Sequence, residues 1–307
     1  MHKLIDSTIL FVITLLKASK GETSFHDFEV SSERIHFRCR TGIYPFSVER
    51  LAVPDDKVRW DCDWSDYKPP FFTAFSTVGQ PWADPDIGDN NFNPQWNSVD
   101  GLLNRRSYIG TYTVSKNYPI NPIGRTGLAG RGVLGRWGPN HASDTVVTRW
   151  KRDGENLLIH NPTSGKPILQ MIAIQKRSGE WGLPGGMVNP GENVPAAGKR
   201  EFFEEVLAYE FKSNDSLKIE LLDKLFKKGE EIYKGYVDDP RNTDNAWVET
   251  IALHYHDASG KLLDSLTLRA GDDACNVSWM DVDRNIQLYS AHQKFVYKMT
   301  SRLNAHF

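Results

Sequence analysis

The sequence has 307 residues, of which 39% are hydrophobic and 25% are charged, and its formal net charge is −2 at pH 7. This length can bury the core of one large domain or of two modest ones, and the near-neutral charge excludes a global attraction toward nucleic acid or anionic membranes. The three cysteines, Cys39, Cys62 and Cys275, are an odd number without CxxC spacing, which argues against a disulfide framework and a structural zinc site. We expect ordinary thiols, with a single disulfide in an oxidising compartment as the alternative.

Residues 1–40 are interpreted as a targeting segment and linker. A basic start precedes a mostly apolar run, residues 9–16, and small residues follow it. This order predicts a secretory signal peptide, because the run is too short to span a bilayer comfortably. A mitochondrial presequence is the alternative, since acidic residues are scarce before Glu22 and arginines follow from Arg34. That alternative requires an amphipathic helix, whereas this run is apolar nearly throughout. We expect no stable membrane association of the mature chain.

Residues 41–140 are rich in Pro, Asp, Trp and Gly and show little sustained periodicity. This composition predicts short strands and ordered loops. Aromatic side chains such as Trp60, Trp64 and Phe72 oppose disorder, because they can bury substantial area despite the many turn residues. We therefore expect a smaller, β-rich N-terminal subdomain that packs on the domain formed by residues 141–307.

The stretch 124–150 concentrates glycines with Arg125, Arg131 and Arg136. Glycine-rich backbone with arginine can cradle phosphates. An ordered linker that wraps onto the next domain is the more ordinary interpretation, and we favour it. The sequence contains no P-loop and no GxGxxG motif that joins a predicted strand to a predicted helix.

Residues 141–307 contain both strand and helix patterns. Strands are predicted at 145–152, 167–176, 232–237, 247–255 and 277–282. Helices are predicted at 195–207, 211–231 and 288–303. Because these strands and helices follow one another without a βαβ repeat, the order predicts an α+β domain.

Three carboxylates share one face of the predicted helix 195–207. Glu201, Glu204 and Glu205 stand at i, i+3 and i+4, and no Lys or Arg follows any of them by four residues. Arg200 can pair with Glu204 only in the weaker orientation, and acidic residues late in a helix oppose its dipole. A solvated acidic helix is the ordinary interpretation, but it leaves this repulsion uncompensated. A hard divalent cation would compensate it, and Mg²⁺, with Mn²⁺ as the alternative, prefers such oxygen ligands.

The same stretch resembles the Nudix box, the signature of hydrolases that cleave nucleoside diphosphates linked to another group. The resemblance rests on Gly186, on Glu192 after five further residues, and on REFFEE, which starts at Arg200 after seven more. Leu207 stands where the family pattern has Gly, a packing position that binds no ligand. The resemblance implies a Nudix α/β/α sandwich, in which Glu192 and Arg200 support the site. It implies a metal site built from Gly185, Glu201, Glu204 and Glu205.

The sequence DDPRNTDNAW, which starts at Asp238, resembles a loop of the animal, mitochondrial-type ADP-ribose pyrophosphatases and of the related domain in melastatin-type cation channels. The likeness extends from about residue 44 to the carboxyl terminus and includes GRTGLAGRGVLGRWGPNHA and TRWKRD. A solvated hairpin is the ordinary interpretation of such a loop. The resemblance implies that Arg241 faces a diphosphate, which suits its planar fork, and that Asp239 faces a ribose hydroxyl. It makes Asp244 a third candidate for substrate contact.

Four further residues are candidates from the same resemblance. Asp272 and Asp273 precede the last predicted strand, where many Nudix enzymes place an acidic loop that supplies an extra metal ligand or the base. A surface turn explains them equally well, because Gly-Asp pairs favour turns. Tyr289 and His292 stand three residues apart, and core packing or surface exposure is their ordinary interpretation. The resemblance implies contact with the adenosine instead, with Tyr289 as a stacking face.

These observations predict Mg²⁺-dependent hydrolysis of ADP-ribose to AMP and ribose 5-phosphate. We expect a monomer with a small-molecule substrate and no nucleic-acid partner. A Nudix pyrophosphohydrolase that acts on another nucleoside diphosphate derivative is one alternative, since the box indicates the reaction and not the leaving group. A non-catalytic ADP-ribose-binding domain is the other, and the intact Glu204 and Glu205 argue against it.

Overall fold

The computed structural model describes residues 34–208, 216–271 and 274–307. Residues 36–307 form one compact unit, which contains every helix and strand of the described chain. Within the described ranges no helix has both the length and the apolar character needed to cross a bilayer. The predicted targeting run, residues 9–16, lies outside these ranges.

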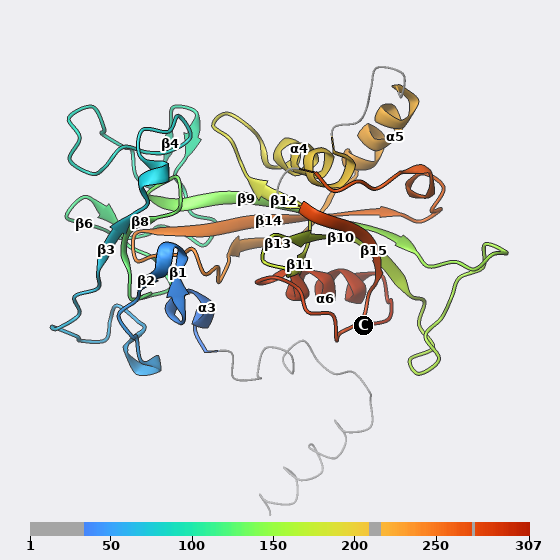
Figure 1. The fold of residues 1–307 in the computed structure, drawn as a ribbon, viewed down its shortest axis with the longest axis horizontal. Helices are drawn as coiled ribbons and strands as arrows, with labels where there is room; N and C mark the ends of the chain where they lie inside the picture. Colours follow the sequence, from blue (N-terminus) through green and yellow to red (C-terminus); the bar gives the residue numbers. More distant parts are fainter. Residues whose placement is uncertain (1–33, 209–215, 272–273) are drawn as a thin grey trace, which may run out of the picture. The chain divides into compact units, whose positions relative to one another are not determined.

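A seven-stranded mixed sheet lies at the centre of the fold (Figure 1). Its strands are β9 (Gly138–Trp150), β10 (Leu169–Lys176), β11 (Trp181–Gly182), β12 (Gly185–Met187), β13 (Glu230–Tyr236), β14 (Ala246–Asp257) and β15 (Ala274–Asp281). The main path runs β11-β10-β9-β14-β13, while β12 also pairs with β9 and β15 also pairs with β10. β9 and β14 pair in parallel, and the other pairs are antiparallel.

Helices cover both faces of this sheet (Figure 1). They are α4 (Val194–Leu207), α5 (Ser216–Phe226) and α6 (His292–Arg302). Val146 packs in the core cluster that contains Phe295 of α6, whereas its neighbour Val147 packs in the cluster that contains Phe202 of α4, because successive strand residues point to opposite faces. Each such fully buried side chain stabilises the fold by about 1.5–3 kcal/mol. The predicted α+β class and the α/β/α sandwich are confirmed.

The helix α4 begins and ends as its sequence predicts. Asn193 caps it, since the Asn193 Oδ1 accepts a hydrogen bond of 2.9 Å from the Ala196 N–H, and Pro195 fits the first turn. At the other end Ala208 adopts a left-handed conformation with φ 44°, and its N–H donates to the Phe203 carbonyl. These caps fix where the acidic face of α4 stands relative to β12.

Several predicted boundaries are wrong. β9 begins at Gly138, well before its predicted start, because its first part pairs with β12 and β14 although it shows no apolar alternation. β13 begins at Glu230, inside the predicted helix 211–231, part of which lies outside the described residues. The chain leaves the helix before Gly229, where an added Cβ would lie 2.6 Å from the Tyr255 ring. The remaining predicted elements of this region correspond to β10, β14, β15 and α6, although β15 begins at Ala274 and not at residue 277, and α6 begins at His292 and not at residue 288.

Before β9 the described chain consists of short strands, one short α-helix and loops, which include the 3₁₀ turns η1 (Pro45–Ser47), η2 (Asp55–Lys57) and η3 (Phe75–Thr77). The helix and the strands are α3 (Phe37–Arg40), β1 (Ile43–Tyr44), β2 (Val48–Glu49), β3 (Phe71–Thr73), β4 (Val99–Asp100), β5 (Leu103–Asn104), β6 (Val114–Ser115), β7 (Tyr118–Pro119) and β8 (Ala129–Gly132). They form the two-stranded pairs β1-β2, β3-β8, β4-β5 and β6-β7. The three cysteines are free thiols. The expectation of short strands and ordered loops is confirmed.

The three arginines of the glycine-rich stretch bond within this N-terminal region. Arg125 donates to backbone carbonyls of a preceding loop and lies 4.9 Å from the centroid of the Trp60 ring. Arg131 donates to a carbonyl in its own turn, and Arg136 pairs with Asp84 at 3.0 Å. Their donors therefore hold the N-terminal region together, which agrees with an ordered linker and not with a phosphate cradle.

Candidate active site

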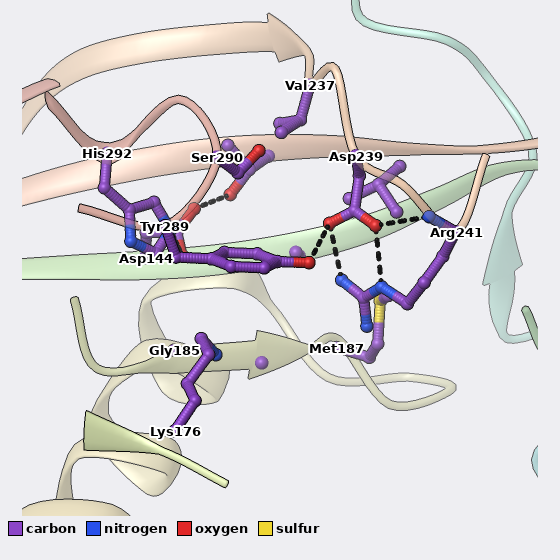
Figure 2. Close-up of a pocket in the computed structure, with 14 residues that line it drawn as sticks. Asp144, Lys176, Gly185, Met187, Val237, Asp239, Arg241, Tyr289, Ser290 and His292 are labelled. Carbon is purple, nitrogen blue, oxygen red and sulfur yellow. Dashed lines mark hydrogen bonds and ion pairs between the residues drawn. The ribbon is translucent and has the colours of Figure 1, made fainter. Parts of the chain in front are cut away.

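A pocket opens where β12, the loop between β13 and β14, and the segment before α6 meet (Figure 2). Its lining comprises Ala142, Asp144, Lys176, Gly185, Gly186, Met187, Val237, Asp239, Arg241, Val248, Thr250, Tyr289, Ser290 and His292. Four of the five predicted substrate-binding residues are among them. The pocket thus brings together residues from four separate parts of the sequence.

Asp239 and Arg241 form a forked ion pair at one side of the pocket. Arg241 Nε lies 2.8 Å from Asp239 Oδ1 and Arg241 Nη2 lies 2.9 Å from Asp239 Oδ2, while the Tyr289 hydroxyl donates to Asp239 at 3.3 Å. Burial alone would raise the pKa of Asp239, but the guanidinium of Arg241 outweighs it and lowers that pKa. The Arg241 side chain is 39% exposed, and the fork leaves its Nη1 outside the pair. This geometry can present a fixed guanidinium to an anionic ligand.

The tautomer of the neutral His292 ring follows from its neighbours. Its Nδ1 accepts a hydrogen bond of 2.9 Å from the Leu183 N–H, so the neutral ring carries its proton on Nε2. That Nε2 lies 3.5 Å from Asp144 Oδ1, and the other Asp144 oxygen accepts a hydrogen bond of 2.7 Å from the Thr250 hydroxyl. His292 therefore acts as a donor toward the pocket. Burial would raise the pKa of Asp144, but the partners of this carboxyl, His292 foremost, lower it.

Sequence reasoning did not identify Asp144 or Lys176 as site residues. Lys176 ends β10, and its ammonium lies 5.1 Å from the centroid of the Tyr289 ring. Both residues stand in strand patterns without a neighbouring motif, so no local signal marks them. Only the pairing of the strands brings them to the pocket.

The acidic face of α4 lies behind β12. Glu205 is 5% exposed and accepts a hydrogen bond of 2.9 Å from the Gly185 N–H, and burial raises its pKa to about 8. Arg200 Nη1 lies 2.8 Å from Glu201 Oε1 and 3.1 Å from Glu204 Oε2. Arg200 also pairs with Glu192 at 3.0 Å, which ties the loop after β12 to the helix. This geometry suits the supporting role that the resemblance implies for Glu192 and Arg200.

The donor set suits a divalent cation, although the side chains are not arranged around one point. Within the described ranges no three His, Cys, Asp or Glu side chains form a ready metal cluster, and Arg200 lies between Glu201 and Glu204. A positive charge is nevertheless favoured beside the buried Glu205, whose raised pKa reflects the cost of burying its ionised form. Gly186 lets the Glu201 carboxylate lie against the backbone of β12, because a Cβ added at this glycine would lie only 2.3 Å from Glu201 Oε1.

Asp244 does not line the pocket, so its predicted contact with substrate does not match its position. It is 4% exposed, and one oxygen accepts hydrogen bonds of 2.7 and 2.8 Å from the N–H and hydroxyl of Thr126. The other oxygen accepts a hydrogen bond of 2.6 Å from the Tyr67 hydroxyl. Burial raises the pKa of Asp244 to about 6. This carboxyl joins the loop to the N-terminal region. Asp272 and Asp273 lie outside the described residues, and their role stays a prediction.

Known proteins resemble this chain along most of its length. The family model for the NUDT9-like N-terminal domain matches residues 53–138, and that for the NUDIX domain matches residues 140–303. The mitochondrial ADP-ribose pyrophosphatase of Rattus norvegicus is 50% identical over 279 residues, which cover 89% of this chain and 79% of that protein. The transient receptor potential cation channel subfamily M member-like 2 of Nematostella vectensis is 45% identical over 282 residues, which cover 89% of this chain and 18% of the channel.

Proposed function

This chain belongs to the NUDIX domain family, and from that membership we propose that it hydrolyses ADP-ribose to AMP and ribose 5-phosphate with a divalent cation, Mg²⁺. The observation that carries the proposal is the position of β12 between the two halves of the site. Gly185 and Gly186 line the pocket that holds the Asp239–Arg241 pair, and they contact Glu205 and Glu201 on the other side. A diphosphate bound in the pocket therefore lies beside the carboxylates of α4.

The reaction breaks a P–O bond of the anhydride, and water supplies the oxygen of the new P–O bond and loses a proton. We assign metal binding to Glu201, Glu204, Glu205 and the carbonyl of Gly185. A bound divalent cation would neutralise charge on the phosphates and lower the pKa of a water molecule. Asp272 and Asp273 are the proposed source of a further ligand or of the proton acceptor.

The other site residues orient the substrate. Arg241 binds the diphosphate through the guanidinium N–H groups that its fork with Asp239 leaves outside the pair. Asp239 aligns this guanidinium and accepts a ribose hydroxyl. Tyr289 offers a stacking face to the adenosine, and His292 is the second residue proposed to contact it. Glu192 and Arg200 hold the loop after β12 against α4, so that the carboxylates keep their positions.

The direct test is to incubate the purified protein with ADP-ribose, with and without Mg²⁺, and to separate the products by chromatography. We expect AMP and ribose 5-phosphate only with the cation. The same assay with ADP-glucose and with a dinucleoside polyphosphate tests whether the enzyme acts on another nucleoside diphosphate derivative. Faster turnover of either compound than of ADP-ribose would assign that compound as the substrate. Binding of ADP-ribose without products in Mg²⁺ or Mn²⁺ would show a non-catalytic domain.

Residues 41–140 and 141–307 are proposed to be the N-terminal subdomain and the Nudix hydrolase domain. The end of one family match at residue 138 and the start of the other at residue 140 support this division.

We further propose a mitochondrial location for this protein. The name of the rat relative and the arginines from Arg34 onward support this location over secretion. Cleavage is expected before Phe37, because the N–H groups of Arg38 and Cys39 donate to Asp238 in the folded unit. Sequencing the amino terminus of protein isolated from a mitochondrial fraction checks this. Recovery of the protein from the culture medium would contradict the mitochondrial location. Mitochondrial protein that retains Met1 would contradict the cleavage.

A further inference from the structure

The loop that carries Asp239 and Arg241 is held by the N-terminal region. Of the residues 238–245, only these two side chains line the pocket. The other polar side chains of the loop, apart from Asn242, bond to residues that precede β9. They are Asp238, Thr243, Asp244 and Asn245.

Two N-terminal side chains also bind three consecutive backbone carbonyls of this loop. The Tyr44 hydroxyl donates to the Arg241 carbonyl at 2.8 Å. Arg50 Nη2 donates to the Pro240 carbonyl at 2.7 Å and to the Asn242 carbonyl at 3.0 Å. The Arg50 guanidinium also lies 4.8 Å from the centroid of the Tyr44 ring, so the two side chains support each other. The carbonyls on both sides of Arg241 are thereby fixed, along with its own.

Tyr44 fits its site closely. It is 1% exposed, and its hydroxyl accepts a hydrogen bond of 2.9 Å from the Val133 N–H while it donates to the loop. Gly132 provides the space, because with φ 63° and no side chain it lets the hydroxyl approach, whereas an added Cβ would lie 2.0 Å from that oxygen. A buried hydroxyl with a partner on each side holds its position, since loss of either partner would leave a buried polar group unsatisfied.

We propose that Tyr44 and Arg50 are positioning residues for substrate binding, which act by fixing the backbone of 240–242 so that Arg241 presents its guanidinium to the diphosphate. The proposal rests on the proposed function. It assigns a part of the specificity of the pocket to side chains that lie outside the Nudix domain. Small displacements of a binding group are costly, because oriented hydrogen bonds require the partners to be in place before the substrate arrives.

Tyr44→Phe tests the proposal, because it keeps the ring and removes the donor to Arg241. The variant loses both hydrogen bonds of the hydroxyl, and loss of the one to the Arg241 carbonyl is expected to raise the KM for ADP-ribose roughly 2- to 10-fold. We expect little change in kcat. The decisive measurement is a double-mutant cycle with Arg241→Lys. If Tyr44 acts through Arg241, Tyr44→Phe should change KM far less in the Arg241→Lys background than in the parent.

Tyr67→Phe is the matched control, since the Tyr67 hydroxyl bonds to Asp244 of the same loop at 2.6 Å but not to the backbone of Arg241. It should lower Tm and leave KM unchanged in both backgrounds. The proposal would be overturned if Tyr44→Phe changed KM equally in both backgrounds. It would also be overturned if Tyr67→Phe were coupled to Arg241→Lys as strongly as Tyr44→Phe is. Should Tyr44→Phe not fold, Arg50→Lys replaces it, because an ammonium keeps the charge but does not reproduce the bonds that the guanidinium donates to the carbonyls of Thr126, Pro240 and Asn242. A parent without turnover contradicts the proposed function alone, and the cycle is then measured on the Kd of ADP-ribose by calorimetry.

Discussion

Glu205→Gln is expected to reduce the turnover of ADP-ribose at least about a hundredfold, which corresponds to about 2.7 kcal/mol of transition-state stabilisation. The amide oxygen of glutamine can still accept the Gly185 hydrogen bond, so the local geometry is kept while the charged ligand is lost. Initial rates at saturating Mg²⁺ measure the effect. Equal turnover in this variant and the parent would rule out Glu205 as a metal ligand.

The same substitution should not lower the stability of the metal-free protein. The pKa of Glu205 is raised from 4.5 to about 8 in the fold. The stability that this group contributes is therefore fully present below about pH 4.5 and is lost as the pH rises toward about 8. Glutamine stays neutral throughout, so Glu205→Gln should melt at the same or a higher temperature than the parent near pH 8 in a chelator.

Glu220→Gln serves as the control for Glu205→Gln. Glu220 lies on α5 and forms an exposed ion pair with Lys224 at 2.8 Å, and no role in the site is predicted for it. It should change neither turnover nor the dependence of Tm on pH. Mg²⁺ should raise the Tm of the parent and of Glu220→Gln, because a ligand that binds only the folded state stabilises it. A lower Tm of metal-free Glu205→Gln at pH 8 would contradict the electrostatic argument.

Arg241→Lys should raise the KM for ADP-ribose about 10- to 100-fold, because a single ammonium cannot replace the paired hydrogen bonds of a guanidinium. The substitution also removes the fork that aligns Arg241 with Asp239. Steady-state kinetics in Mg²⁺ give KM and kcat, and calorimetry in a chelator gives the Kd of ADP-ribose. We expect both KM and Kd to rise.

Arg105→Lys is the control for Arg241→Lys. Arg105 forms a similar fork with Asp84, at 2.8 and 3.0 Å, but in the N-terminal region and outside the pocket. Arg105 and Asp84 are both buried, so this variant should lose stability without a change in KM. A KM for Arg241→Lys that matches the parent would remove Arg241 from the site, and a raised KM in Arg105→Lys would show that any buried arginine gives the same effect.

Local patterns in the sequence determined α4 and the carboxylates that share one of its faces. Asn193 and Pro195 begin the helix through contacts within one turn, and the spacing of Glu201, Glu204 and Glu205 sets them on one face. Local signals also predicted most strands of the sheet and the α+β class, and the resemblance carried by residues 186–205 implied the family and its α/β/α sandwich. These properties depend on residues close together in the chain, so a single sequence is sufficient to find them.

The tertiary structure alone decided which residues share the pocket. Asp239 and Asp244 are the same residue type in one loop, but one faces the pocket and the other faces Tyr67 and Thr126. The direction of a side chain in a loop depends on backbone angles, and contacts with residues more than a hundred positions away fix them here. Asp144 reaches the pocket for the same reason, since the pairing of β9 with β12 and β14 places it there. Such long-range contacts have no local pattern, so they became visible only in the folded chain.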